Sequence, residues 1–411
     1  MLLTDLKVRK SRLNELDLRL LFSVLGLTLL GLVLIYSADH SQGIKTHFIR
    51  QVYFGMFGLL LLIATAALPP RIYYALAYVI YGLSILGLFL VPLSGIIGLG
   101  ARRWLVIGGI NIQPSEPAKL ALVLALARIL SHRGLPVTVW KMLGLSALLC
   151  LPPTALVLLQ PDLGTATVFP VITAVMLAWF GLPFKIFVLF ILPVISLFLL
   201  VNPWIVAPLL IAGLIILRKS DVRWFGLSGM IILCMIATFA APMAWRQLEP
   251  YQQKRLTTFL NPAADPLGSG YQIIQSKVAV GSGGFTGQGF LQGTQTQLRF
   301  LPEQHTDFIF ALAGEEFGFA GTTTIILLFI LFGWSGYRQA TRVKSIFMGF
   351  VLVGLTTLVL YHAVVNIGMA VGTLPVTGLP LPFLSYGGSF LITCLICTGI
   401  MLSAGLYRRE S

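Results

Sequence analysis

Apolar residues gather along this chain in stretches of roughly twenty, and short polar segments separate them. A helix needs about 20 apolar residues to cross the hydrocarbon core of a bilayer. The pattern therefore predicts a polytopic all-α membrane protein with about twelve transmembrane helices. The predicted spans are 18–38, 48–68, 72–92, 116–131, 142–159, 163–181, 184–201, 204–217, 224–244, 321–336, 346–370 and 387–407.

Two of these spans, 184–201 and 204–217, are short and are separated only by Asn202, Pro203 and Trp204. If 184–217 were one broken span, every later segment would invert across the membrane. The basic clusters at 338–344 and 408–409 would then face outward, against the bias of Lys and Arg towards the cytoplasm. We therefore interpret the region as two short crossings.

Composition and charge agree with a membrane protein. The chain is 57% hydrophobic and only 10% charged, whereas a soluble domain carries about a quarter charged residues. The net charge of +14 comes from short basic clusters between apolar runs, which indicates the positive-inside rule rather than a nucleic-acid partner. Both termini are therefore predicted to be cytoplasmic, and residues 1–17 form a cytoplasmic N-terminal segment. The four cysteines lie in apolar stretches and predict no disulfide.

One connection is much longer than the others. Residues 245–306 are rich in Gly, Gln, Thr and Pro and are predicted to form a long extracytoplasmic loop with short helices. Loops longer than about 15 residues are usually functional. The apolar segment 307–336 would be about 45 Å long as one helix, which exceeds the roughly 30 Å that a span needs. Gly314, Gly318 and Gly321 mark places for a break, so we expect a half-helix from about Thr306 and then a span.

Ionisable residues cluster at the predicted outer ends of the spans. A charge near the bilayer centre costs about 2.5–3.5 kcal/mol, so such residues need partners or a wet cavity. Their position on one side predicts a single outward-facing site. The candidates are Glu116, Lys119, Asp162, Glu303, His305 and Asp307, with Arg102 and Arg103 between the third and fourth spans.

Structural alternatives exist for most of these candidates. Glu116 and Lys119 share a helix face and fit a helix end that Ser115 caps and whose lysine snorkels to the interface. Asp162 fits a helix N-cap, and Arg102 and Arg103 fit interfacial anchors beside Trp104.

Asp307 also has a structural alternative, as a first-turn acid that complements the helix dipole. Thr306 could instead cap the helix and leave the carboxylate for chemistry, and the long loop that delivers this segment favours chemistry. Glu315 and Glu316 lie deeper, and we expect at least one of them to be paired or to face the cavity.

Other polar features predict packing or turns. His362 lies within a span and fits packing. The stretch Gly281 to Gly289 lacks the Gly-Lys-Ser/Thr ending of a P-loop and predicts tight turns.

Four segments together make the sequence resemble the SEDS family (shape, elongation, division and sporulation). They are Pro114-Ser-Glu-Pro-Ala-Lys119, Gln160-Pro-Asp-Leu-Gly-Thr165, Leu301-Pro-Glu-Gln-His-Thr-Asp-Phe308 and Leu381-Pro-Phe-Leu-Ser-Tyr-Gly-Gly-Ser389. Leu163, together with Gly293 to Arg299, looks more like the rod-shape branch, RodA, than the division branch, FtsW. The resemblance covers the chain from the first span to the C-terminus. It implies one membrane domain over residues 1–411, with a family core of about ten spans and an inserted helix pair at 184–223.

The resemblance implies a peptidoglycan glycosyltransferase of the bacterial plasma membrane that polymerises lipid II for elongation. It also implies a class B penicillin-binding transpeptidase as partner. One lipid II would be donor and another acceptor, and undecaprenyl diphosphate would leave. Such a reaction needs a general base and cations at the diphosphate. Asp307 is the expected base, and Lys119 would orient it or stabilise the diphosphate. Glu116, Asp162, Arg102, Arg103, Glu303, His305 and Ser385 would line the substrate site. No metal-ligand set is predicted, and a divalent cation, Mg²⁺ or Mn²⁺, at the diphosphate is left open.

Two other functions fit the same pattern. A lipid II flippase would also place polar groups among its spans, although alternating access needs them along a whole path. A non-catalytic scaffold for cell-wall enzymes is the second alternative.

Overall fold

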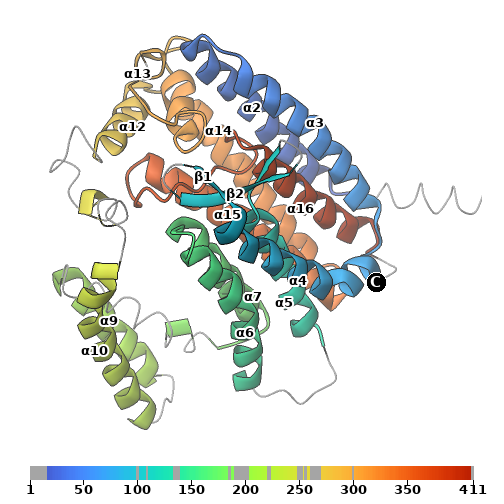
Figure 1. The fold of residues 1–411 in the computed structure, drawn as a ribbon, viewed down its shortest axis with the longest axis vertical. Helices are drawn as coiled ribbons and strands as arrows, with labels where there is room; N and C mark the ends of the chain where they lie inside the picture. Colours follow the sequence, from blue (N-terminus) through green and yellow to red (C-terminus); the bar gives the residue numbers. More distant parts are fainter. Residues whose placement is uncertain are drawn as a thin grey trace, which may run out of the picture. The chain divides into compact units, whose positions relative to one another are not determined.

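The computed structural model describes residues 16–98, 101–107, 110–132, 139–183, 187–188, 203–219, 224–247, 253, 257–259, 270–298 and 300–408. Within them, seven helices are long and apolar enough to cross a membrane, so the predicted polytopic all-α class is confirmed. The helices are α2 (Leu18–Gln42), α3 (Thr46–Ala67), α4 (Pro70–Ser94), α5 (Ser115–Leu130), α6 (Val139–Leu158), α7 (Leu163–Trp179), α9 (Pro203–Lys219), α10 (Trp224–Gln247), α12 (Tyr271–Ser282), α13 (Thr294–Gln297), α14 (Ile309–Ala340), α15 (Ile346–Ala370) and α16 (Gly388–Leu406) (Figure 1).

A small antiparallel sheet between α4 and α5 was not predicted from the sequence. Its three strands are β1 (Ile96–Gly98), β2 (Ala101–Ile107) and β3 (Ile110–Ile112), in the order β1-β2-β3. Strand β2 carries the two predicted arginines. The sheet therefore gives Arg103 a fixed backbone position rather than a place on a free loop.

The chain divides into two compact units, which are described separately. One comprises residues 1–176 and 258–411, and the other comprises 177–257. The second unit contains α9 and α10, which contact each other and match the predicted spans 204–217 and 224–244. The predicted span 184–201 lies almost entirely outside the described residues. The inserted helix pair therefore stays a prediction.

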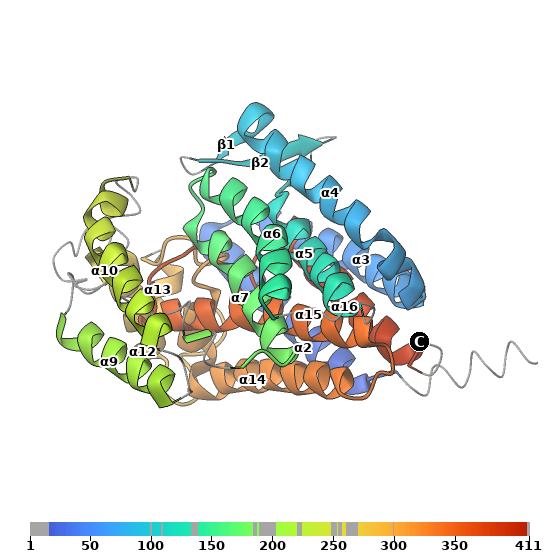
Figure 2. The ribbon, with the colours of Figure 1, turned by 90° about the horizontal axis from the view of Figure 1, so that it is seen from below.

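In the first unit, α15 and α16 are buried along most of their length. Helix α3 packs along α16, α14 packs against α15 and α2, and α5 packs against α4 and α15 (Figures 1 and 2). Small residues allow this close approach: Gly58 faces Leu395, and Gly354 faces Val123. Helices in lipid associate through such packing, because lipid tails are as apolar as the side chains themselves.

Helix α14 is interrupted at Gly318, whose φ of 62° and ψ of −156° are not helical. This is one of the three glycines at which a break was predicted. The helix itself begins at Ile309 and not at Thr306. A short helical piece therefore precedes the longer span, as the length of the segment had indicated.

The glycine-rich segment 283–289 satisfies the backbone at this break. The amides of Gln288 and Gly289 donate to the carbonyls of Glu315 and Glu316 at 2.9 and 3.2 Å. On the other side of the break, the amides of Phe319 and Ala320 donate to the carbonyls of residues 284 and 285 at 2.9 and 3.0 Å. Non-helical backbone is tolerated at membrane depth only where protein groups or water form hydrogen bonds with its amides and carbonyls. The segment thus does more than form the tight turns that were predicted.

Candidate functional site

The first turn of α5 carries a buried ion pair. The Lys119 Nζ atom lies 2.8 Å from Glu116 Oε2, and both side chains are buried. The interpretation of Lys119 as a snorkelling side chain is therefore wrong. The predicted Ser115 cap is also wrong, because the N-cap of α5 is Pro114 and no side chain caps the helix. A charge pair this deep needs further polar partners.

His362 on α15 supplies one of those partners. Its Nε2 lies 3.0 Å from Lys119 Nζ, and its Nδ1 lies 3.4 Å from the Pro380 carbonyl. The lysine ammonium can only donate, so Nε2 is the acceptor and Nδ1 carries the proton. Phe390 on α16 places its ring 5.3 Å from the ammonium. The interpretation of His362 as mere packing missed this role, although a histidine inside an apolar span was a signal for it.

One turn along α15, Asn366 connects this cluster to the segment that holds Asp307. Its side-chain amide donates to the Asp307 carbonyl at 3.0 Å and to the Leu379 carbonyl at 2.8 Å. His362 and Asn366 are four residues apart, so they share one helix face. On that face, Asn366 fixes the Asp307 backbone and His362 contacts Lys119.

The 381–389 motif braces the 301–308 motif through backbone contacts. The buried Ser385 hydroxyl donates to the Thr306 carbonyl at 2.6 Å and accepts from the Leu381 amide at 2.8 Å. The Tyr386 amide donates to the His305 carbonyl at 2.8 Å. Within the protein, Ser385 therefore acts as a brace for the segment that leads to Asp307.

Gln51 on α3 holds the same loop from the opposite side. Its side-chain nitrogen donates to the Ser385 carbonyl at 3.1 Å, and its oxygen accepts from the Gly387 amide at 3.2 Å. The side chain is almost fully buried. Sequence reasoning missed Gln51, because one glutamine in an apolar span does not reveal which loop it contacts.

Asp307 lies just outside α14. The N-cap of that helix is Phe308, and the first turn contains no acidic residue, so the interpretation of Asp307 as a first-turn acid is wrong. Thr306 does not cap the helix either, because its hydroxyl donates to Glu303, to the carbonyl at 3.3 Å and to Oε2 at 3.1 Å. The Asp307 amide donates to the Glu303 carbonyl at 3.1 Å. Its side chain is partly exposed, whereas the neighbouring Phe308 is buried.

Asp162 caps α7, as one reading of the sequence had predicted. Its carboxylate accepts from the Thr165 amide and from the Thr165 hydroxyl, each at 3.0 Å. Arg103 Nε lies 3.8 Å from Asp162 Oδ2, and Arg103 Nη2 donates to the Pro161 carbonyl at 2.7 Å. Asp162 is also close enough to Glu116 for their charges to interact. The backbone of Arg102 lies in β2, and its side chain is outside the description.

An aspartate and two histidines form a second polar cluster beside the Asp307 segment. His47 Nδ1 lies 2.8 Å from a carboxylate oxygen of the buried Asp39, whose other oxygen accepts from the Phe48 amide at 2.8 Å. The His47 ring stacks on His305 at 4.4 Å between centroids and meets Tyr386 edge-on at 4.7 Å. Of these residues, only His305 was predicted.

Burial lowers the pKa of His305, and the neighbouring His47 lowers it further, against the opposing effects of Glu303 and Asp39. His305 therefore favours the neutral form more than a free histidine does. Glu303, by contrast, is exposed, and its left-handed backbone (φ 50°) places it at the turn before Asp307.

The two deep glutamates both have hydrogen-bond partners, in line with the prediction for at least one of them. Glu315 accepts from the amides of Gln295 at 2.7 Å and Thr296 at 3.0 Å, and so stabilises the first turn of α13. Glu316 accepts from the Ser37 hydroxyl on α2. These contacts tie the loop and α2 to the short helical piece that begins beside Asp307.

The predicted site residues therefore fall into connected groups. Lys119 and Glu116 reach the Asp307 backbone through His362 and Asn366, whereas Arg103 and Asp162 fasten β2 to α7. In the described part of the chain, the ion pair of Lys119 is with Glu116 and not with Asp307. Among the described residues, no group of three or more His, Cys, Asp or Glu could hold a metal ion.

A model of the FtsW/RodA/SpoVE cell cycle proteins matches residues 18–210 and 206–410. The chain belongs to this family. Its members include the peptidoglycan glycosyltransferase MrdB of Escherichia coli K12, which is 38% identical over 396 residues, 96% of this chain and 95% of that protein. Stage V sporulation protein E of Bacillus subtilis is 36% identical, over 96% of this chain and 98% of that protein.

Solved structures of the FtsW/RodA/SpoVE family have the same fold. A chain from a peptidoglycan synthase complex, described as coordinating polymerization and crosslinking, is 34% identical and superposes with a TM-score of 0.71. It is matched over 96% of this chain and 99% of that one. RodA of Thermus thermophilus is 29% identical over 96% of this chain and 98% of that one, with a TM-score of 0.64. The family resemblance of the four motifs is thereby confirmed.

Proposed function

We propose that this chain polymerises lipid II into glycan strands for cell elongation, as a peptidoglycan glycosyltransferase with Asp307 as its general base. Curated relatives that match nearly its whole length are peptidoglycan glycosyltransferases. The observation that carries the assignment of the base is the placement of Asp307. Its carboxylate is partly exposed, while Asn366 and Ser385 fix the backbone on either side of it.

The proposed chemistry is one direct displacement. The 4-hydroxyl of the acceptor sugar attacks the anomeric carbon of the donor, and undecaprenyl diphosphate leaves with the electron pair of the broken bond. Because an α-linked diphosphate becomes a β-1,4 linkage, the anomeric centre inverts and no covalent enzyme intermediate is needed. Asp307 takes the hydroxyl proton as the bond forms.

Lys119 is proposed as a positioning residue rather than a ligand of the diphosphate. It is fully buried between Glu116 and His362, and its contacts reach the Asp307 backbone through α15. The partly exposed Arg103 and its neighbour Arg102 on β2 are the proposed cations for the departing diphosphate. A divalent cation would be carried by the diphosphate, because the described residues offer no cluster of ligands for it.

The membrane arrangement and the partner follow from the same proposal. Both substrates carry lipid tails, so we place the reaction at the outer leaflet of the plasma membrane, with both termini cytoplasmic. The related synthase complex, described as coordinating polymerization and crosslinking, supports a class B penicillin-binding transpeptidase as partner.

The test is glycan synthesis by the purified full-length protein. With lipid II as substrate and gel analysis of the products, Asp307→Asn should lower polymerisation by about 10²–10⁴-fold. Glu303→Gln is the comparison variant, because this exposed carboxylate lies four residues away, contacts Thr306 and is expected to line the substrate site without taking the proton. It should lose far less activity.

Thermal unfolding of both variants should match that of the wild type. Near-normal polymerisation by Asp307→Asn would refute the assignment of the base. Lipid II flipping in proteoliposomes without any glycan synthesis by the wild type would instead favour the flippase alternative.

A further inference from the structure

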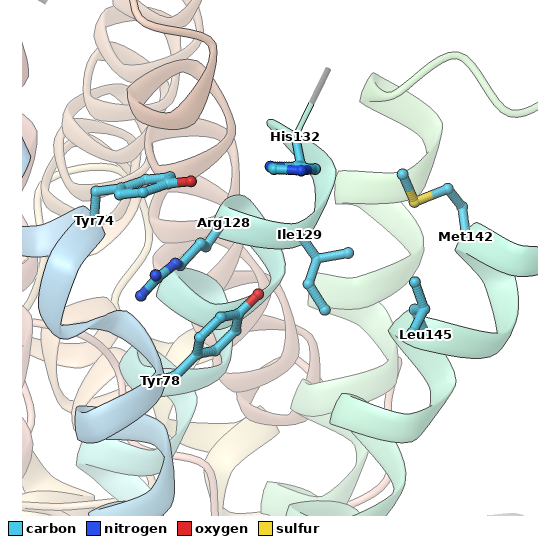
Figure 3. Close-up of a pocket in the computed structure, with 7 residues that line it drawn as sticks. All are labelled: Tyr74, Tyr78, Arg128, Ile129, His132, Met142 and Leu145. Carbon is cyan, nitrogen blue, oxygen red and sulfur yellow. The ribbon is translucent and has the colours of Figure 1, made fainter. Parts of the chain in front are cut away.

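A cavity of about 280 Å³ lies between the helix ends at which α4 begins, α5 ends and α6 begins. Figure 3 shows Arg128 reaching between Tyr74 and Tyr78, with His132 and Ile129 beside it and Met142 across the cavity. This volume lies just below the range of about 300–1,000 Å³ that is usual for ligand pockets. The cavity is therefore large enough for a headgroup but not for a whole lipid. Its lining is Tyr74, Tyr78, Arg128, Ile129, His132, Met142 and Leu145.

The cation at the centre of this cavity is held rigidly. The Arg128 guanidinium carbon lies 4.7 Å from the Tyr74 ring centroid and 4.4 Å from the Tyr78 ring centroid, and Nη1 donates to the Ala75 carbonyl at 3.1 Å. Phe347 packs edge-on against Tyr74 at 5.2 Å and so fixes that ring. Stacking of this kind orients the planar donors of arginine and leaves its charge unneutralised.

No carboxylate balances this charge in the described part of the chain. Among the described residues, the Arg128 side chain makes one hydrogen bond, to a backbone carbonyl, so further guanidinium N–H groups are available to an anion. His132 follows one turn later and lines the same cavity. The Tyr74 and Tyr78 hydroxyls add two further donors, for which the described residues supply no hydrogen-bond partner. The cavity therefore presents a cation and several donors without an internal anion.

The cavity is far from the proposed catalytic site. Glu116 lies in the first turn of α5 and Arg128 in the last, twelve residues apart, which corresponds to about 18 Å along the helix axis. Further along the same two helices, apolar side chains are exposed on the protein surface, including Val79 and Leu83 on α4 and Leu148 and Leu151 on α6. An acyl chain could lie along them while its headgroup enters the cavity.

We infer that this cavity is a binding site for the phosphate headgroup of an anionic phospholipid in the leaflet opposite the catalytic site. Arg128 forms charge-assisted hydrogen bonds to the phosphate oxygens, and the tyrosine hydroxyls and His132 complete its donor set. Basic pockets between transmembrane helices on the cytoplasmic side bind headgroups in this manner. The exposed apolar surface along α4 and α6 favours a lipid over free phosphate as the source of the anion.

The test counts lipids retained by the full-length protein in native mass spectrometry, with phosphatidylglycerol or phosphatidylcholine as the added lipid. The wild type should retain phosphatidylglycerol more strongly than phosphatidylcholine. Arg128→Gln should weaken that retention about tenfold, and Arg128→Lys should recover only part of it because the planar fork is lost. Lys141→Gln is the matched control, since this exposed lysine lies beside the cavity on α6 but outside its lining. It should stay within about twofold of the wild type.

A second variant distinguishes a specific loss of lipid binding from a loss caused by misfolding. Tyr74→Phe with Tyr78→Phe keeps both rings and their stacking on Arg128 but removes the two hydroxyl donors, and it should weaken retention less than Arg128→Gln does. Equal losses in Arg128→Gln and Lys141→Gln would show diffuse surface electrostatics and overturn the site. Equal retention of the two lipids by the wild type would also overturn it. Displacement of phosphatidylglycerol by millimolar inorganic phosphate would assign the cavity to free phosphate instead.

Discussion

Lys119 shows how a charge is kept in a place where lipid and packed side chains exclude water. Its ammonium contacts a carboxylate, an imidazole nitrogen and the face of Phe390. Burial of two charges costs several kcal/mol per ion, and the contacts between them offset that cost only when the geometry is good. Removal of one partner leaves the other charged and unpaired, whereas removal of both leaves a neutral site.

A double-mutant comparison should reveal this difference. Lys119→Met leaves Glu116 without its cation and should destabilise the protein by about 3–5 kcal/mol. Lys119→Met combined with Glu116→Gln should unfold closer to the wild type than Lys119→Met alone does, while both proteins lose polymerisation. Thermal unfolding in detergent and the glycan gel give the two readouts. A loss in the double variant equal to the sum of the losses in Lys119→Met alone and Glu116→Gln alone would contradict a buried pair that acts as one unit.

His305 gives a prediction about pH. Burial and His47 lower its pKa in the folded protein, so the unfolded chain takes up a proton at about pH 6.5 while the folded chain does not. Stability should therefore fall as pH drops through that value and level off once the folded His305 also becomes protonated. His305→Phe keeps a stacking ring and should flatten this part of the profile.

The measurement is the unfolding midpoint between about pH 8 and pH 5 for the wild type and His305→Phe. His132→Phe is the control, since the side chain of this histidine is exposed. His47 and its buried partner Asp39 face His305. The pH profile of a His47→Phe variant should therefore also differ from that of the wild type. Parallel profiles for the wild type and His305→Phe would show that His305 does not carry the effect.

At this scale, the sequence revealed acidic and basic residues better than it revealed their partners. Glu116, Lys119 and Asp307 were predicted because each is costly in or beside an apolar span. Asn366, Gln51 and the Asp39–His47 pair were missed, because their roles depend on which helices become neighbours. The caps predicted for α5 and α14 failed for a related reason, since the path of the incoming backbone decides which residue faces the free amides.

At the scale of elements, span lengths were predictable and the connections were less so. Apart from α14, which begins at Ile309 and not at residue 321, the described helices that match predicted spans begin and end within a few residues of them, because a roughly 30 Å core requires continuous apolar runs. The small sheet was missed because its longest strand, Ala101–Ile107, carries two adjacent arginines after Ala101 and has no alternating pattern. The break in α14 was predicted from length and glycine content, but its pairing with the segment 283–289 required the structure.

That pairing predicts a sharp contrast between two glycines. Gly287 has a φ of 84°, and a Cβ there would overlap the Glu316 carbonyl, so Gly287→Ala should destabilise the protein by at least about 1–3 kcal/mol. Gly281 lies within α12 with open space around it, and Gly281→Ala should be neutral or stabilising by up to about 1 kcal/mol. Thermal unfolding in detergent measures both. Equal unfolding midpoints would show that the segment does not pair with the break.

At the scale of the whole molecule, the motifs at 114–119, 301–308 and 381–389 are joined through α15 in the unit that holds residues 1–176 and 258–411, whereas Arg103 holds the motif at 160–165 to β2. Their presence at one predicted side of the membrane was inferred from the distribution of Lys and Arg. Their mutual contacts could not be inferred, because the order of spans along a chain does not determine their order in space. The count of spans in region 184–223 depends on residues that lie mostly outside the description.

The sidedness of this unit gives the last prediction, and α14 is the element that tests it. After the break at Gly318 the helix continues to Ala340, about 33 Å at 1.5 Å per residue, which is long enough to cross the membrane, so the two ends of α14 should lie on opposite sides. Pro302 and Thr341 are exposed just beyond those ends, and the basic cluster at 338–344 marks the cytoplasmic one. In a Cys234→Ser background, Pro302→Cys should react with a membrane-impermeant maleimide in intact spheroplasts. Thr341→Cys should react only after permeabilisation, and the buried Cys150, Cys394 and Cys397 should stay unlabelled. Labelling of Thr341→Cys in intact spheroplasts would invert the topology and place Asp307 on the cytoplasmic side, away from the outer leaflet at which the proposed polymerisation occurs.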